Sequence, residues 1–392
     1  MMTDSHMISG YLYSGYSDCS DEKMQAHTIR IESGQIIDIS EYEPENEQQA
    51  ASLPLLVPGF IDVHNHGGFH GSFPNGNYED CKRAARFHRS HGTTTLLASL
   101  VSASEQQLYA QTRILARLAQ EGEIYGIHME GPFICAHKCG AQDPHHIIPG
   151  NPEILEKVIN NAQGFLRSIT FAPETDHIDE LLDLCAKHNV IASLGHTDAD
   201  YHSTLAVIDK ARQLGVTVSA THLFNAMPPI HHRTPGATVA LLNAAQENKV
   251  FCELVADGVH LHDAVVDMSY PHNAIAVTDA MEAAGMPDGH YQLGSLSVVV
   301  EQGGAFLADA YAQGTHTIAG GTSTLAQQFA RFASRHGIAD AVRFTSTRAA
   351  QLLGLPDRSR LEPGARADIV ALNKDHTVRA TFAHGEKLLP LT

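Results

Sequence analysis

Short apolar runs followed by polar residues recur along most of this chain. Between Pro58 and Leu355, such a run is followed by a loop and then by a longer stretch with apolar residues every three or four positions. The short runs predict buried strands, and the longer stretches predict amphipathic helices. Eight strands are predicted in this way: Gly59–Val63, Thr94–Ser99, Ile124–Met129, Ser168–Ala172, Val190–Leu194, Val216–Ala220, Phe251–Ala256 and Ala274–Thr278.

Helices are predicted between most of these strands, for example at Ser104–Gln120 and Thr204–Leu214. Two more, Thr322–His336 and Ala339–Leu353, follow the last strand. Eight strands that alternate with helices predict a (β/α)8 barrel of the TIM type. A doubly wound open sheet is the alternative, but it should carry a glycine-rich phosphate-binding turn after its first strand. No convincing turn of that kind follows Val63.

The two chain ends have a different pattern, in which short apolar stretches alternate with turn residues. These stretches predict strands at Ile8–Tyr13, Ala26–Ile31, Gln35–Ile39, Ala367–Leu372 and Val378–Leu389. The acidic, glutamine-rich segment Glu41–Ala51 is predicted to be a solvated loop. We expect residues 1–57 and 356–392 to pair into one small β-sandwich domain, with the catalytic barrel of residues 58–355 inserted between them.

Composition narrows the range of partners. The net charge of −18 argues against binding to nucleic acid and to an anionic membrane surface, and a phosphate-bearing substrate would need a local positive group. Six scattered cysteines without a C-x-x-C pair do not predict a disulfide framework. The N-terminal residues lack a basic segment and an apolar core, and no long apolar run is present, so we expect a cytoplasmic protein.

The first predicted barrel strand ends in His64-Asn65-His66. Residues two apart on a strand point to the same side, so His64 and His66 would aim at one point. Two converging imidazoles are suited to a metal ion. A pair of hydrogen-bonded structural histidines is the alternative, and this motif alone does not decide between the two.

Most of the other predicted strands also end in residues that can bind metals or transfer protons. These residues are Glu130, His196, His222, Asp257, His260 and Asp279. The carboxyl ends of the strands in a barrel form one rim, where barrel enzymes carry their catalytic groups. A single histidine at a strand end is often structural, but so many placements on one rim indicate an active site.

Specific motifs occur in one order between Val57 and Asn373. They are PGFIDVHNHG, GIHMEGPF, LGHTDA, THLFNAMPP, ADGVH, VTDA and AGGTSTL, followed by GLPDRSRLEPGARADIVALN. In these motifs the chain resembles the N-acetylglucosamine-6-phosphate deacetylases of the amidohydrolase superfamily. Many amidohydrolases carry a bridging lysine at the end of strand four, but the segment SITFAPE has none, and the resemblance implies that Glu130 takes its place.

The resemblance implies a divalent metal, zinc above all, with one or two ions per subunit. One ion would be held by Glu130, His196 and His222, with a position left open for water. A second would be held by His64 and His66, with Glu130 between the two ions; alternatively, these histidines only form hydrogen bonds around the first site.

The implied reaction is hydrolysis of the acetyl amide of N-acetylglucosamine 6-phosphate in amino-sugar catabolism. Asp279 would take a proton from the attacking water and return it to the departing amine. The resemblance further implies substrate contacts from Ala141, Gln142, Asn225, Ala226, Arg233, Asp257, His260, Ile318, Ala319 and Gly320.

Two of these residues carry further expectations. Arg233 offers a planar fork for phosphate, and in relatives this arginine comes from the neighbouring subunit, which implies a homodimer. Gln142 stands where the family has a histidine; it can donate a hydrogen bond but cannot carry a proton. The loop Phe133–Ile148 is expected to close over the substrate.

Other readings stay open at this point. Within enzymes, the substrate could be N-acetylgalactosamine 6-phosphate or another N-acyl amino sugar, because motifs do not show an epimer preference. A relative without catalysis that binds other proteins is the alternative from a different class. Such relatives typically lose metal ligands, whereas Glu130, His196, His222 and Asp279 are all present here.

Overall fold

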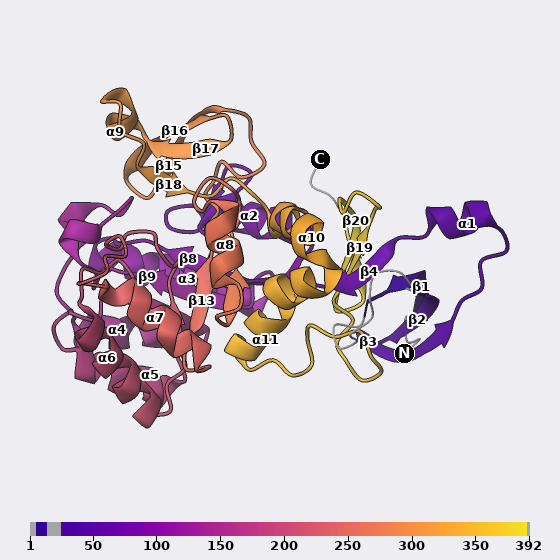
Figure 1. Ribbon diagram of the computed structural model, residues 1–392, viewed down its shortest axis with the longest axis horizontal. Coiled ribbons are helices and arrows are strands. Elements are labelled where there is room, and N and C mark those ends of the chain that lie inside the picture. The colour runs from indigo at the N-terminus through magenta and orange to yellow at the C-terminus, as the bar shows by residue number, and fades with distance from the viewer. Residues whose placement is uncertain (1–4, 14–24, 390–392) are drawn as a thin grey trace. The chain divides into compact units, whose positions relative to one another are not determined.

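The computed structural model describes residues 5–13 and 25–389, which form two compact units (Figure 1). The first unit comprises the described residues within 1–62, 86–95 and 324–392. The second comprises residues 63–85 and 96–323. The domain bounds expected from the sequence, at 57/58 and 355/356, stay a prediction.

Both ends of the chain contribute to one sheet in the first unit. Its strands are β1 (Ser5–Leu12), β2 (Ala26–Glu32), β3 (Gln35–Glu41), β4 (Leu55–Pro58), β19 (Ile369–Leu372), β20 (Val378–Ala383) and β21 (Glu386–Leu388), in the order β21-β20-β19-β4-β1-β2-β3. Strand β4 pairs antiparallel with β19, with Leu56 opposite Ala371, so the expected pairing of the chain ends is confirmed. Ile29, Leu56 and Ile369 are fully buried in its apolar core.

The segment predicted as a solvated loop contains a short helix, α1 (Glu47–Ser52). Asn46 begins it, because its side chain accepts a hydrogen bond from the backbone N–H of Gln49 at 2.9 Å. The loop prediction was therefore wrong for these residues, although none of them is buried.

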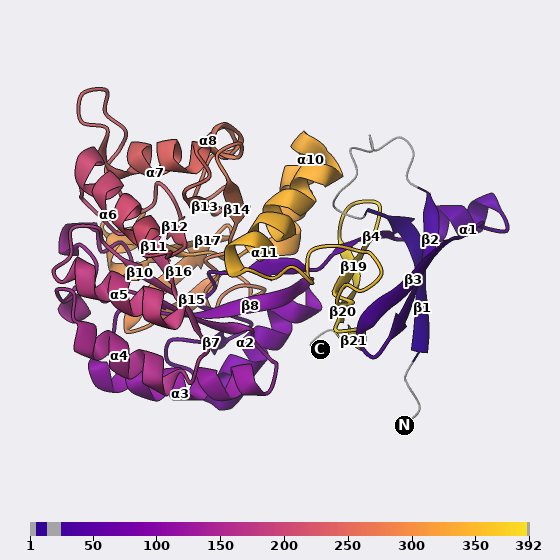
Figure 2. The same cartoon turned by 90° about the horizontal axis from the view of Figure 1, so that it is seen from below.

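All eight predicted barrel strands are confirmed. They are β5 (Phe60–Asp62), β8 (Thr93–Leu100), β9 (Gly126–Glu130), β10 (Leu166–Phe171), β11 (Ile191–Leu194), β12 (Val218–Ala220), β13 (Phe251–Leu254) and β14 (Ala274–Ala276), in the order β14-β13-β12-β11-β10-β9-β8-β5. Figure 2 shows helices outside these strands: α3 (Glu105–Gln120), α4 (Pro152–Asn161), α5 (Ile178–His188), α6 (Tyr201–Gln213) and α7 (Gly236–Gln246). Two further helices, α2 (Tyr78–Ser90) and α8 (Asp263–Ser269), follow β7 (Gly71–Ser72) and β13. This is the predicted (β/α)8 barrel.

The first and last strands of the barrel sheet are joined just beyond their carboxyl ends. The N–H of Asp279 donates to the carbonyl of His64 at 2.9 Å, and the N–H of His66 donates to the carbonyl of Ala280 at 2.7 Å. Asn65 forms a parallel bridge with Ala280, and its side-chain amide donates to Thr278 Oγ1 at 2.9 Å. These bonds place His64 and His66 beside Asp279.

The sequence analysis missed an antiparallel sheet inserted after β14. It consists of β15 (Gly289–Leu293), β16 (Leu296–Glu301), β17 (Gly304–Leu307) and β18 (Ile318–Gly320), with α9 (Ala308–Ala312) before the last strand. The sequence signal for this sheet was the pair Gln302-Gly303 between two apolar runs, which indicates a hairpin turn. In the structure both residues have positive φ, as a tight hairpin turn requires.

The two helices predicted near the C-terminus are present in modified form. Helix α10 (Leu325–Val342) begins with a capping box between Thr324 and Gln327 and is broken at Gly337, which has a φ of 82°. A π-helical turn at Arg343–Thr347 then leads into α11 (Arg348–Leu353). Among the described residues, no helix combines the length and the apolar character needed to cross a bilayer.

We predict that Asn65→Ala weakens the joint between the first and last barrel strands. The variant loses the bond to Thr278 and the bond that Asn65 Oδ1 accepts from the N–H of Gly67 at 3.0 Å. The free energy of unfolding, measured by denaturant titration, should fall by about 1–3 kcal/mol. The exposed Asn160→Ala serves as a control and should change it by less than about 0.5 kcal/mol; equal effects would contradict the prediction.

Candidate metal centre

Two histidine side chains from different strand ends meet at one carboxylate oxygen of Glu130, which itself ends a third strand. Oε1 of Glu130 lies 3.1 Å from His196 Nε2 and 3.0 Å from His222 Nε2. The two imidazole nitrogens lie 3.1 Å apart. These residues, Glu130, His196 and His222, form the first ligand group, and all three are buried.

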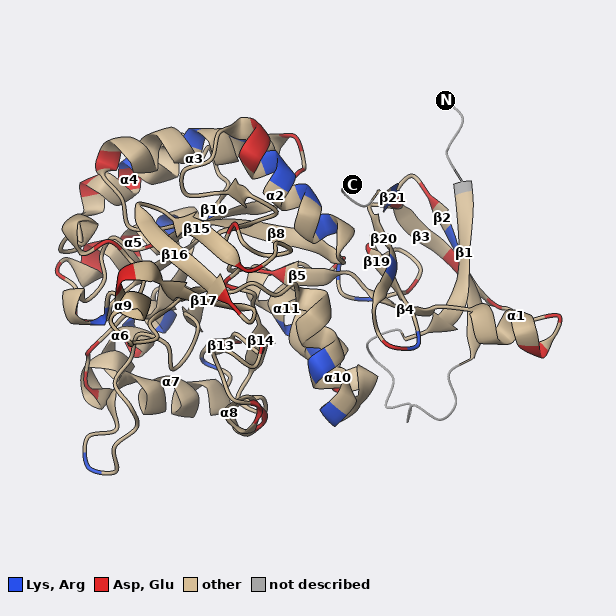
Figure 3. Cartoon of the chain, turned by 90° about the horizontal axis from the view of Figure 1, so that it is seen from above, with Lys and Arg blue, Asp and Glu red and all other residues tan. Residues whose placement is uncertain are grey.

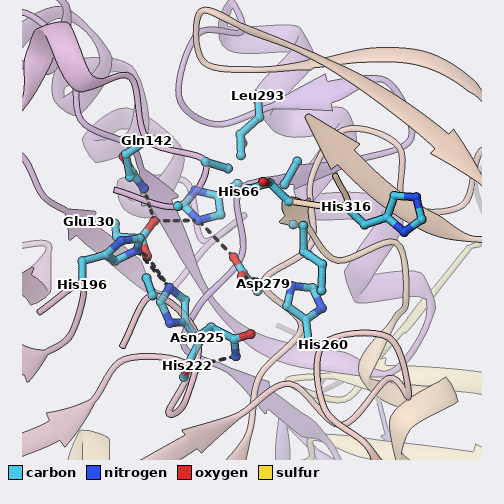
Figure 4. Close-up of a pocket in the computed structure, with 17 residues that line it drawn as sticks. His66, Glu130, Gln142, His196, His222, Asn225, His260, Asp279, Leu293 and His316 are labelled. Carbon is cyan, nitrogen blue, oxygen red and sulfur yellow. Dashed lines mark hydrogen bonds and ion pairs between the residues drawn. The ribbon is translucent and has the colours of Figure 1, made fainter. Parts of the chain in front are cut away.

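A second ligand group consists of His64, His66 and Asp279. Asp279 Oδ1 lies 3.4 Å from His64 Nε2 and 3.3 Å from His66 Nε2. Glu130 connects the groups, because its Oε1 lies 3.5 Å from His64 Nε2 and its Oε2 lies 3.3 Å from His66 Nε2. Figure 4 shows Glu130 with His196 and His222 on one side and His66 on the other.

The donor atoms of both groups fit a divalent metal ion. Ligands of a tetrahedral ion with bonds of about 2.0–2.1 Å lie about 3.3 Å from one another, close to the separations within each group. Histidine nitrogens combined with carboxylate oxygens are suited to ions such as zinc. The expected ligands His64, His66, Glu130, His196 and His222 therefore lie together, and Asp279 lies with them.

The backbone is strained where several of these side chains originate. His196, His222 and Asp279 all have positive φ angles, of 48°, 26° and 48°. Non-glycine residues adopt such angles at a cost of about 1–3 kcal/mol each, and they concentrate at functional sites. Backbone bonds hold two of these residues: the His196 carbonyl accepts from the N–H of Cys135 at 2.9 Å, and the Asp279 carbonyl accepts from the N–H of Gly321 at 2.6 Å.

Each ligand group contains one histidine whose second ring nitrogen has a fixed partner. His196 Nδ1 donates to the carbonyl of Lys138 at 2.8 Å, and His64 Nδ1 contacts Oε2 of Glu253 at 3.1 Å. The Nδ1 atoms of His66 and His222 have no hydrogen-bond partner within the described residues. The partnered nitrogens leave the Nε2 atoms of His64 and His196 available as ligands.

The charges of the centre shift the pKa values of its members. Burial by itself would lower the pKa of His64, but the carboxylates of Glu130 and Asp279 outweigh it and raise that pKa well above its usual value. Burial would raise the pKa of Glu130, yet the charge on His64 and hydrogen bonds from His196 and His222 lower it well below its usual value. An ion that binds here displaces protons from imidazole, so its affinity falls as the pH falls.

The ligand groups open into a pocket with a volume of about 230 Å³. Its lining contains most of the residues expected to contact a substrate: Ala141, Gln142, Asn225, Ala226, His260, Ile318, Ala319 and Gly320. The sequence analysis missed Leu293, His316 and Thr317, which also line it. They belong to the inserted sheet and its last connection, so finding them required the hairpin signal at Gln302-Gly303.

Two expected binding residues do not line the pocket. Asp257 lies behind it, where Oδ2 accepts a hydrogen bond from His260 Nδ1 at 2.8 Å. Arg233 is exposed on the loop between β12 and α7, which extends away from the barrel and has a basic tip (Figure 3). The binding roles expected for these two residues stay predictions.

Gln142 lines the pocket, but both ends of its side-chain amide have protein partners. Its Nε2 donates to Glu130 Oε2 at 2.5 Å, and its Oε1 accepts from the N–H of Ser102 at 2.6 Å. The loop Phe133–Ile148 is also held by Asp143, whose carboxylate accepts from Ser295 Oγ at 2.6 Å. Hydrogen bonds from Ser295 and from the N–H of His145, which outweigh some burial, lower the pKa of Asp143 to about 2.

None of the described cysteine thiols belongs to either ligand group. Those described, Cys81, Cys135, Cys139, Cys185 and Cys252, are free thiols, as the sequence predicts, and Cys19 lies outside the described residues. Burial raises the pKa of Cys81 and of Cys185 to about 12, so these two thiols are inert at neutral pH.

Comparison with known proteins identifies clear relatives. Residues 55–388 match the amidohydrolase family. N-acetylglucosamine-6-phosphate deacetylase of Bacillus subtilis (strain 168) is 32% identical over 376 residues, which cover 91% of each protein. The Homo sapiens protein of the same name is 30% identical over 386 residues, covering 93% of this chain and 92% of the human protein.

The chain shares its fold with the solved structure of a deacetylase. A mutant N-acetyl-D-glucosamine-6-phosphate deacetylase from Mycobacterium smegmatis, in complex with N-acetyl-D-glucosamine 6-phosphate, superimposes with a TM-score of 0.87. The two chains are 34% identical, and the match covers 98% of this chain and 99% of the other.

We predict that removing metal with a chelator lowers the melting temperature and that zinc restores it. An ion present at a thousand times its dissociation constant adds about 4 kcal/mol to the free energy of unfolding. Glu130→Gln should abolish the response, because it removes the carboxylate shared by both ligand groups. Glu156→Gln, at an exposed position, should respond as the parent does. If neither chelator nor zinc changes the melting temperature of the parent, the metal centre is refuted.

Proposed function

The chain belongs to the amidohydrolase family, and from this premise we propose that it converts N-acetyl-D-glucosamine 6-phosphate into glucosamine 6-phosphate and acetate. The observation that carries the proposal is the convergence of both ligand groups and Asp279 on one pocket. A divalent ion held there would polarise the acetyl carbonyl of the substrate and lower the pKa of a bound water. The relatives named N-acetylglucosamine-6-phosphate deacetylase support this choice of substrate.

Asp279 is the residue we assign to proton transfer. Its Oδ1 faces His64 and His66, and its Oδ2 lies 3.6 Å from His260 Nε2 at the pocket wall. Burial opposes its ionisation, but the charges on nearby histidines, His64 first, lower its pKa, so the side chain is a carboxylate at neutral pH. It takes the proton of the attacking water and delivers it to the amine, which cannot leave without it.

His260 closes the side of the pocket next to Asp279. Burial would lower its pKa, but the hydrogen bond to Asp257 and the charge of that carboxylate raise it. Its Nδ1 is held by Asp257, so the Nε2 edge stays directed at Asp279 and the pocket. We assign it to orienting the sugar beside the carboxylate.

The phosphate of the substrate is best bound by a side chain with a permanent positive charge. None of the described residues lining it is a lysine or an arginine, and the whole chain has a net charge of −18. Arg233 stands on an extended loop outside the pocket. We propose that the enzyme is a homodimer in which Arg233 of the partner subunit binds the phosphate with its planar fork.

The ligand set supports zinc as the ion, with two ions per subunit, because each group provides at least three donor atoms. Amino-sugar catabolism is the process that this reaction serves. The cytoplasmic location expected from the N-terminal sequence stays a prediction.

The test of the function is acetate release from N-acetylglucosamine 6-phosphate by the zinc-loaded protein, beside the galactose epimer. Asp279→Asn keeps the shape of the side chain but removes its basicity, so kcat should fall by about 100-fold to 10,000-fold. Asp198→Asn, at an exposed position on the same rim, should keep the parent rate. A metal-loaded parent that releases no acetate from the glucose epimer would move the search to other N-acyl sugars.

The dimer proposal predicts a specific effect of Arg233→Ala. KM for the sugar phosphate should rise by about tenfold to 100-fold, since a charge-assisted bond contributes about 1.5–3 kcal/mol, while kcat changes little. Arg212→Ala, which removes another exposed arginine, provides the control. At a substrate concentration below the KM of Arg233→Ala, mixing this variant with Asp279→Asn should raise activity through hybrid dimers, and a mixture no more active than its two components would argue against a shared site.

A further inference from the structure

Glu253 on β13 is a buried carboxylate for which the proposed reaction has no role. Its side chain is 3% exposed and lies inside the barrel below both ligand groups. Four groups approach its oxygens: His64 Nδ1 at 3.1 Å, the N–H of His222 at 3.3 Å, and the hydroxyls of Ser193 and Ser219, each at 3.2 Å. A buried charge is tolerated when it is hydrogen-bonded in this way.

The contacts of Glu253 fix the direction of the hydrogen bond from His64. An ionised carboxylate has no hydrogen to give, so each group that bonds to it must donate. The N–H of His222 can only donate, and Ser193 can do so, while the one hydrogen of Ser219 also has Ser193 Oγ as an acceptor at 2.8 Å. His64 must therefore carry a hydrogen on Nδ1, so Nε2, which faces His66 and Asp279, is the nitrogen that a metal ion would bind.

A row of hydrogen bonds across the barrel supports this assignment. Because Ser193 gives its hydrogen to Glu253, Thr221 must donate to Ser193 at 2.6 Å, and Thr170 must then donate to Thr221 at 2.8 Å. His128 Nε2 lies 2.8 Å from Thr170 and becomes the next donor. The row thus requires a hydrogen on His128 Nε2.

The far end of the row agrees with that requirement. Ser99 Oγ accepts from the N–H of Asn65 at 2.9 Å, so its own hydrogen is free to point at His128 Nδ1, also at 2.9 Å. Every member of the row from Asn65 to Glu253 then donates in one direction.

We propose that Glu253 is a positioning residue that holds His64 in the Nδ1–H form and thereby makes His64, His66 and Asp279 a binding site for a second metal ion. The other histidine of that group, His66, has no partner for Nδ1 among the described residues, so the orientation of the pair depends on His64. The proposal rests on the metal centre of the proposed function, but it does not depend on which amide is hydrolysed.

The experiment measures zinc binding to the full-length protein without substrate, by competition with a coloured chelator. The parent should bind two ions per subunit. Glu253→Leu removes the acceptor, and the dissociation constant of one ion should rise by about 10-fold to 100-fold. Glu253→Gln keeps an acceptor oxygen for His64 Nδ1 but loses the negative charge, so the same constant should rise by about twofold to tenfold. Ser219→Ala, which removes one other donor to Glu253, should leave both constants close to those of the parent.

The affected ion is assigned with His66→Gln, which removes a ligand of the second group only. In that background Glu253→Leu should cause no further loss, because the remaining ion is held by Glu130, His196 and His222. One ion per subunit in the parent, equal weakening of both ions, or unchanged constants in Glu253→Gln would overturn the proposal. Glu253→Gln decides the matter if Glu253→Leu does not fold, and acetate release, assayed separately, reports on the proposed function itself.

Discussion

The whole site depends on the backbone pairing between the segments that follow the first and last barrel strands. The bonds from Asp279 to His64 and from His66 to Ala280 join these two segments at the rim. Without them, the first strand's histidines and the last strand's carboxylate would belong to separate edges of a sheet. Closure therefore does more than remove exposed sheet edges: it completes the second ligand group from residues more than 200 positions apart.

Beneath this rim, the barrel interior is polar instead of apolar, and that is what keeps the ligands in place. Ser193, Thr221, Thr170 and His128 come from four neighbouring segments, and each has a hydrogen-bond partner in the same layer. A fully satisfied buried network fixes its members more rigidly than apolar packing does, whereas a partly satisfied one would be costly. The strained φ angles of His196, His222 and Asp279 persist because such a surrounding structure determines them.

The sequence allowed the barrel and most of the pocket to be predicted, because both follow from local patterns. Each strand is a short apolar run, and each ligand stands directly after one, so the positions of His64, Glu130 and Asp279 could be inferred without a structure. Glu253 could not be found in this way, since it lies within a strand, where an isolated polar residue gives no periodic signal. The inserted sheet with Leu293 and His316 was missed because only a turn marks it.

Gln142 connects two parts of the site through its side-chain amide. The amide is hydrogen-bonded at both ends, to Ser102 and to Glu130. Its Nε2 carries a second N–H, which can still donate to a substrate carbonyl while the first is bonded to Glu130. Its bond restrains Glu130 Oε2, the oxygen that faces His66. The loop of residues 133–148 is thereby tied to the carboxylate that faces both ligand groups.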